Sequence, residues 1–344
     1  MAEYKSIKGF KTQSFATDPV ASQAAGGSWA SGGNLNDARS ELVGAGIQTA
    51  AMAYSGYTPA GASTTQSESY DGSAWTSTPT LNTPRYAGGG TGVQTAALMF
   101  GGETTPGGPG THTATEEWDG SAWTVGGAMN TGLRYRAGSG TVPAALAMGG
   151  NPPTTTAVEQ YNGSAWTELS ANLNTARTSA GSLNGTGPAS ATLFVGGNTP
   201  PSTNLVEVYD GTSWAETGDL NTSRNQINQG AGTTTEALVF GGVNVPGSPP
   251  PSRTAATEAF DGTAWAIGGD LAVARYGGMG GGSQAAAVTA GGSIGTPTYQ
   301  EVTEEWTTGP ASFVKVQEGQ VWYNSTDSDL KFYNGTATKT VTVS

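Results

Sequence analysis

Short apolar segments separated by polar turn residues recur along the whole of this 344-residue chain. Runs such as residues 96–100 and 192–195 contain no charged residue, which is typical of strands buried on both faces. Asp-Gly or Asn-Gly steps stand between pairs of segments that carry aromatic residues, where a tight hairpin needs positive φ angles. The pattern therefore predicts many short antiparallel strands joined by hairpins.

An internal repeat organises these strands. In each copy a tryptophan is followed ten or eleven residues later by an arginine, then by an apolar strand that ends in a glycine pair, and then by a Glu-x-aromatic triplet. In the first copy Ser55-Gly56 replaces the glycine pair. The tryptophans are Trp29, Trp75, Trp123, Trp166, Trp214 and Trp265. The arginines are Arg39, Arg85, Arg134, Arg177, Arg224 and Arg275, spaced by 43 to 51 residues. The glutamates are Glu68, Glu116, Glu159, Glu207, Glu258 and Glu304. This period suits four short strands per copy.

The repeat predicts an all-β fold, a six-bladed β-propeller with one blade per copy. The last triplet ends at Trp306 without a tryptophan five residues later, and Trp29 has no triplet before it. We therefore expect the strand around Trp29 to complete the last blade, which closes the ring without an exposed seam. The predicted organisation is an N-terminal arm at 1-28, a propeller at 29-306 and a C-terminal β-hairpin module at 307-344.

The combination of Gly-Gly, Glu-x-Tyr and a later tryptophan resembles the kelch repeat over roughly residues 29–306. In kelch proteins the positions of the arginine column often line the partner-binding surface, so the resemblance implies that role for Arg85, Arg134 and Arg177 among others. The resemblance extends to galactose oxidase, whose copper chemistry uses a cysteine-crosslinked tyrosine and histidine ligands. This chain has no cysteine and a single histidine, so it lacks the residues for that activity.

Composition narrows the function further. With 54 glycines, long helices are unexpected. The absence of cysteine and the single histidine exclude a thiol nucleophile, a thiolate metal site and a multi-His metal centre. A net charge of −12 argues against binding to nucleic acid. No apolar stretch approaches the length of a membrane span, and no signal peptide is visible. We therefore expect no catalysis, cofactor, metal site or membrane insertion.

Arginine is the only basic residue type of the predicted propeller, because all six lysines lie outside it. Each column arginine stands at the beginning of the innermost strand of its blade, so the six arginines should surround one mouth of the central channel. The loops of variable length at 57–67, 103–115, 151–158, 198–206, 243–257 and 293–303 should lie on the same face. The predicted partner-binding residues are Arg39, Arg85, Arg134, Arg177, Arg224 and Arg275, with Tyr86, Tyr135 and Tyr276 as stacking surfaces for an acidic or hydroxyl-rich ligand. In the alternative interpretation, the guanidinium groups bind backbone carbonyls and the glutamates and join the blades together.

The two ends of the chain differ from the propeller. Residues 318–326 and 330–336, on either side of Asp327-Ser328-Asp329, alternate as in a β-hairpin. This tract resembles a small module of tail-fibre and other virion proteins of tailed bacteriophages, notably marine ones. The leading hypothesis is therefore a structural protein of the virion exterior that binds other virion proteins through residues 1-28 and 307-344, forms a homo-oligomer and presents its propeller to a host-surface glycan or protein. The alternative is a cellular kelch-type module that binds an acidic protein partner.

Overall fold

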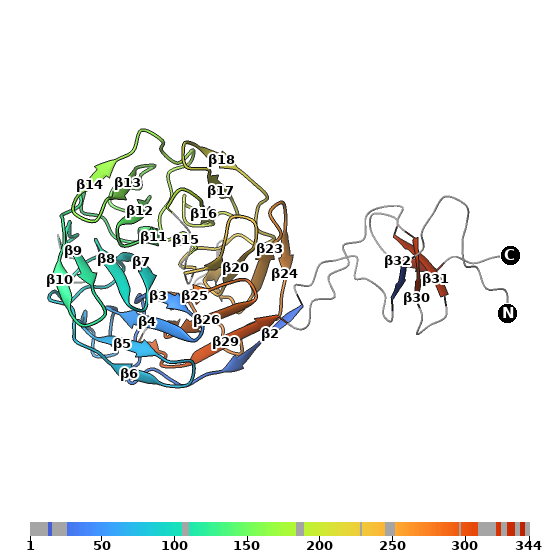
Figure 1. Cartoon of the computed structure of the whole chain (residues 1–344), viewed down its shortest axis with the longest axis horizontal. Coiled ribbons are helices and arrows are strands. Elements are labelled where there is room, and N and C mark those ends of the chain that lie inside the picture. The colour runs from blue at the N-terminus through green and yellow to red at the C-terminus, as the bar shows by residue number, and fades with distance from the viewer. Residues whose placement is uncertain are drawn as a thin grey trace. The chain divides into compact units, whose positions relative to one another are not determined.

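The computed structural model describes residues 13–15, 26–104, 110–183, 189–227, 229–244, 252–295, 297–308, 321–324, 329–333 and 338–340. The chain divides into two compact units, Gly27–Thr308 and a terminal unit that combines Met1–Gly26 with Gly309–Ser344. In the first unit, six four-stranded antiparallel sheets form a ring, which confirms the predicted six-bladed β-propeller (Figure 1). The described residues contain no helix that could cross a membrane.

The first three blades follow the chain without interruption, each with its innermost strand first. Blade 1 consists of β3 (Val43–Ile47), β4 (Ala50–Tyr54), β5 (Ser67–Tyr70) and β6 (Trp75–Ser77). Blade 2 consists of β7 (Gly89–Val93), β8 (Ala96–Phe100), β9 (Thr115–Trp118) and β10 (Trp123–Val125). Blade 3 consists of β11 (Ala137–Thr141), β12 (Ala144–Met148), β13 (Val158–Tyr161) and β14 (Trp166–Glu168).

The other three blades repeat this pattern until the ring closes. Blade 4 consists of β15 (Gly181–Ser182), β16 (Thr192–Val195), β17 (Val206–Tyr209) and β18 (Trp214–Glu216). Blade 5 consists of β19 (Ala231–Gly232), β20 (Ala237–Phe240), β23 (Thr257–Phe260) and β24 (Trp265–Ile267). Blade 6 consists of β25 (Met279–Gly282), β26 (Ala286–Ala290), β29 (Thr303–Thr308) and β2 (Gly27–Ser31).

Blade 6 confirms the predicted closure of the ring. Strand β2 pairs antiparallel with β29, which places Trp29 opposite Trp306 and Gly27 opposite Thr308. The Trp29 ring also packs 4.8 Å from the Phe240 ring of blade 5. The first strand of the propeller therefore completes its last sheet and contacts the blade before it.

Tryptophan side chains join neighbouring blades through their indole N–H groups as well as their apolar surface. Trp75 donates to Thr303 Oγ1 of blade 6 at 2.8 Å, and Trp166 donates to Thr115 Oγ1 of blade 2 at the same distance. In each case the acceptor directly precedes the glutamate of the repeat. The column thus gives each boundary an aromatic ring, which is buried in every blade except at the partly buried Trp29, and a hydrogen bond where a hydroxyl is present.

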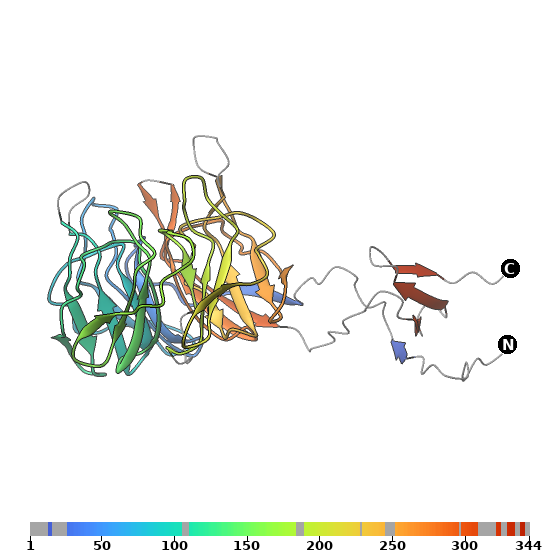
Figure 2. The same ribbon diagram turned by 90° about the horizontal axis from the view of Figure 1, so that it is seen from above.

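The loops that follow the glycine pairs lie on one face of the ring, which we call the loop face. The residue after each column position pairs with the first loop residue, as Tyr86 does with Glu103. Two of these loops form further hairpins, β21 (Val243–Asn244) with β22 (Ser252–Arg253) and β27 (Ser293–Gly295) with β28 (Thr298–Tyr299). Both hairpins project from the same face (Figure 2).

The terminal unit contains a four-stranded sheet in the order β1-β30-β31-β32. These strands are β1 (Gln13–Phe15), β30 (Val321–Asn324), β31 (Asp329–Tyr333) and β32 (Thr338–Thr340). Strands β30 and β31 form the expected antiparallel pair, with Asn324 opposite Asp329; Asp327 and Ser328 of the predicted turn lie outside the described residues. In the N-terminal segment, β1 pairs in parallel with β30.

Candidate functional site

Most of the column arginines lie inside their blades. Five have no exposed surface: Arg39, Arg85, Arg177, Arg224 and Arg275. Arg85 illustrates their contacts, since it donates to Glu116 Oε1 at 2.9 Å and to the carbonyls of Gly101 and Ala114 at 3.0 and 2.7 Å. These contacts are the structural role described by the alternative interpretation. Ligand contact by the five stays an untested prediction, and the candidate site is built from other side chains.

Blade 3 has a leucine where the other blades have the column arginine. Leu133 occupies the column position, because its carbonyl accepts a hydrogen bond from the Gly102 amide at 3.0 Å, as the carbonyls of the other column residues do from their glycine pairs. Arg136, three residues later, supplies the guanidinium and contacts Glu159 Oε1 at 2.5 Å. The alignment of Arg134 with the buried arginines therefore needs correction, because Arg136 makes the equivalent ion pair.

Arg134 instead lies on the loop face, with 32 % of its side chain exposed. Its Nη1 forms an ion pair with Glu103 of blade 2, and Tyr86 donates its hydroxyl to the same Glu103 oxygen at 3.1 Å. The guanidinium also lies 5.4 Å from the centre of the Tyr135 ring. Nearly all of Tyr86 is buried, whereas Tyr276 is partly exposed and pairs through its backbone with Ser293.

A ring of six residues surrounds the channel immediately inside the arginine column. Each lies two positions after the column residue and has a left-handed φ between 45° and 64°: Glu41, Ala87, Tyr135, Ser179, Gln226 and Gly277. Five hydrogen bonds of 2.6 to 3.2 Å run from the amide of one to the carbonyl of the residue before it in this series. Because this backbone belt fixes the six Cα positions, the blades can vary their side chains without altering the ring.

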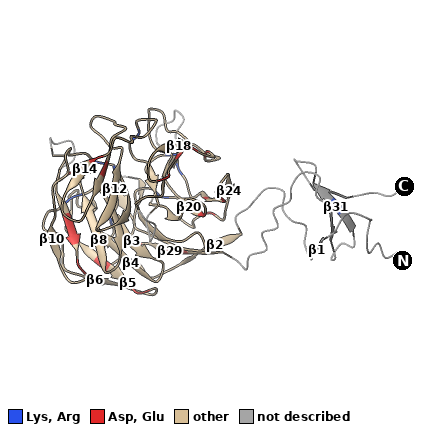
Figure 3. Cartoon of the chain, turned by 45° about the horizontal axis from the view of Figure 1, so that its top comes forward, with Lys and Arg blue, Asp and Glu red and all other residues tan. Residues whose placement is uncertain are grey.

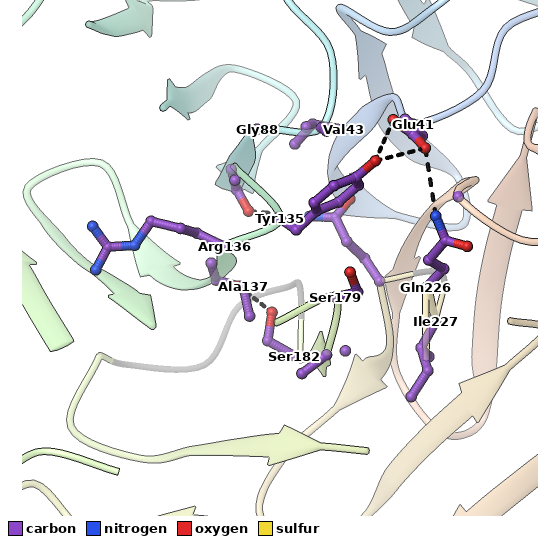
Figure 4. A pocket seen from close by; sticks show the side chains of 18 of the residues that line it. Glu41, Val43, Gly88, Tyr135, Arg136, Ala137, Ser179, Ser182, Gln226 and Ile227 are labelled. Atoms are coloured by element: carbon purple, nitrogen blue, oxygen red, sulfur yellow. Dashed lines mark hydrogen bonds between the residues drawn. The ribbon is translucent and has the colours of Figure 1, made fainter. Parts of the chain in front are cut away.

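Three of these side chains meet at the channel mouth (Figure 4). The Tyr135 hydroxyl lies 3.1 and 3.3 Å from the two oxygens of the Glu41 carboxylate, and Gln226 Nε2 donates to Glu41 Oε1 at 3.5 Å. Burial raises the pKa of Glu41 to about 7, although the Tyr135 hydrogen bond and the charge of Arg134 act in the opposite direction. Burial also raises the pKa of Tyr135, so its hydroxyl stays protonated and can donate. Blades 1, 3 and 5 are thus linked through one carboxylate.

The three side chains border a cavity of about 80 Å³ on the axis of the propeller. Gln229 crosses the channel deeper in the ring: its Oε1 accepts from the Gly44 amide at 2.6 Å, and its Nε2 donates to the Gly90 carbonyl at 3.0 Å. Glycines of the inner strands make up much of the wall, and Glu41 and Arg136 are the lining residues that carry charge. Figure 4 shows that the Arg136 side chain points away from the cavity.

The arrangement is suited to binding through hydrogen bonds and charge. In the described ranges, no three His, Cys, Asp or Glu side chains are grouped as metal ligands. Sequence reasoning found Arg134 and Tyr135 but missed Glu41, Glu103 and Gln226. Their spacing from the arginine column could have identified two of them, since Glu41 and Gln226 each lie two residues after a column arginine.

Comparison with known proteins does not assign the chain to a family. No protein-family model matches the chain, and no curated protein matches it either.

Proposed function

We propose that this chain is a non-enzymatic structural protein on the exterior of a tailed-bacteriophage virion, where its propeller binds a host-surface molecule or another virion protein through the loop face. The observation that carries the binding function is the convergence of Glu41, Tyr135 and Gln226 on a cavity at the channel mouth. Side chains from three blades meet there on a fixed backbone ring, which is the pre-organisation that recognition requires.

Attachment to the particle is assigned to the terminal unit. Both ends of the chain contribute strands to it, and its C-terminal tract carries the resemblance to phage virion proteins. The propeller segment 29–306 holds eight arginines and 21 acidic residues, a net charge of −13, whereas all lysines lie at the two ends. Copies that repel one another through an acidic propeller need another surface for assembly.

Two measurements test this function. Neighbouring genes for portal, tail-tube or capsid proteins, together with detection of the chain by mass spectrometry in purified particles, would support the virion role. A chain found only outside particles, beside cellular genes, would favour the second candidate, a cellular kelch-type interaction module. That candidate rests on the six repeat columns and the propeller they form.

A further inference from the structure

The cavity at the channel mouth is bordered by one carboxylate, that of Glu41, and the charge of Arg134 acts on it from a distance. Among the described residues, no arginine or lysine forms an ion pair with Glu41. Arg134 pairs with Glu103, and Arg136 pairs with Glu159 and points away from the cavity (Figure 4). Most propeller residues are uncharged (Figure 3). Few other side chains can therefore offset the charge of the Glu41 carboxylate.

We propose that this cavity binds a primary ammonium group, with the Glu41 carboxylate as its counter-ion. The inference rests on the binding function proposed above and assigns the ligand chemistry of that same site. The sequence predicts an acidic or hydroxyl-rich ligand. The inference departs from the acidic one, because five column arginines have no exposed surface and the exposed Arg134 already has an acidic partner.

The hydrogen-bonding groups around Glu41 fit an ammonium group better than a metal ion. Mg²⁺ and Ca²⁺ take six or more oxygen ligands, usually including several carboxylates, and the described residues place no such acidic group here. An ammonium group donates three hydrogen bonds. Glu41 has lone pairs beyond those used by Tyr135 and Gln226, and the Ser179 hydroxyl and the Gln226 side-chain carbonyl are further acceptors on the same ring.

The size of the cavity limits what can enter. A volume of about 80 Å³ holds several water-sized groups. Gln229 spans the channel below, so a ligand enters from the loop face and does not pass through. An ammonium group with its attached carbon atoms fits this space, while the rest of the ligand lies among the loops. A lysine side chain and an amino sugar share this chemistry.

Protonation of Glu41 couples ligand binding to pH. The charged and titratable groups that face it are Tyr135, which donates a hydrogen bond, Arg134, Glu103 and Tyr86. The raised pKa of Glu41 means that part of the population is protonated near neutral pH. A bound cation stabilises the carboxylate form, so binding releases protons in slightly acidic solution.

The test is a calorimetric titration of the full chain with N-acetyl-lysine methylamide and with glucosamine. N-acetyl-norleucine methylamide, which lacks the ammonium group, is the matched control ligand. We expect saturable binding of at least one amine at about pH 8, absence of norleucine binding, and an affinity about tenfold or more weaker at about pH 5. The amine that binds more tightly identifies whether the source is a peptide or a sugar.

Two variants locate the binding. Glu41→Gln should abolish binding of the amine, with a melting temperature at least that of the wild type as proof of folding. Glu236→Gln removes an exposed carboxylate from a turn between β19 and β20 and should bind as the wild type does. Amine binding that survives in Glu41→Gln, or a wild type that binds neither amine at about pH 8, would overturn the inference. Detection of the chain in purified particles would be unaffected by that result, so the virion role is judged separately.

Discussion

Trp214 and Val158 share an apolar cluster between blades 3 and 4, and the buried indole N–H of Trp214 has no hydrogen-bond acceptor among the described residues. Residue 158 directly precedes the glutamate of blade 3, a position where Thr115 and Thr303 accept from tryptophans in other blades. Valine has no oxygen to offer. The boundary between blades 3 and 4 therefore has the aromatic packing of the repeat without its hydrogen bond.

Val158→Thr should raise the free energy of unfolding by about 0.5–1.5 kcal/mol, because its hydroxyl can accept the orphaned Trp214 N–H. Val206→Thr is the matched control. It alters the corresponding position of blade 4, where Trp265 already donates to the Gly218 carbonyl at 2.8 Å. Its new hydroxyl gains no indole partner, so we expect a loss of stability. Equal losses in both variants, measured by chemical denaturation, would contradict the prediction.

The two arginines of blade 3 should respond very differently to the same substitution. Arg136→Met leaves the Glu159 carboxylate buried without its partner and should cost about 3–5 kcal/mol. Arg134→Met takes the cation from a buried carboxylate too, but Arg134 is partly exposed and the Tyr86 hydroxyl still donates to Glu103, so the cost should be smaller, about 1–2 kcal/mol. Urea unfolding of the two variants gives the comparison. A larger loss of unfolding free energy for Arg134→Met than for Arg136→Met would contradict the assignment of the buried role to Arg136.

Blade 6 lacks one connection that the other blades have. In the others an asparagine side chain donates to the carbonyl of the outer tryptophan, and in blades 1, 2, 3 and 5 it also donates to the blade's glutamate, as Asn221 does with Trp265 and Glu258. Ala272 takes this place in blade 6, where the outer tryptophan is Trp29. Ala272→Asn should therefore add about 1 kcal/mol of stability, and Asn221→Ala should remove at least as much. No rise in melting temperature for Ala272→Asn would argue against the geometry of the closing strand.

Glu41 should make the propeller less stable as the solution becomes more basic. Its pKa rises from 4.5 to about 7 on folding, so the folded chain binds this proton more tightly than the unfolded chain does. The favourable contribution is complete below the unfolded pKa and is lost as the pH increases through the folded pKa. Glu41→Gln should remove this dependence and become more stable than the wild type at about pH 8. Parallel stability curves for the two proteins between acidic and basic pH would refute the assignment.

The fold could be predicted from the sequence because each structural requirement repeats six times. The glutamates that bind the buried arginines, the glycine pairs at left-handed φ and the tryptophans at blade boundaries each appear at regular intervals. Ring closure could also be predicted from the sequence. The triplet that ends at Trp306 has no tryptophan strand after it, and Trp29 has no triplet before it, so the two strands complete one blade.

The candidate site could be predicted only in part. Arg134 matches the column in its distance from Trp123, but it lies four residues after Asn130, whereas Arg85 lies three residues after Asn82. The buried role of Arg136 appears only in its ion pair with Glu159. The ring position that carries Glu41, Tyr135 and Gln226 has a different residue in every blade, so no column marks it. Their meeting depends on the width of the closed channel, which no segment of the chain determines by itself.

The propeller has two covalent connections to the terminal unit, one before Gly27 and one after Thr308. These two residues lie opposite each other on the adjacent strands β2 and β29 of blade 6. A single proteolytic cut in either connection leaves the propeller attached through the other.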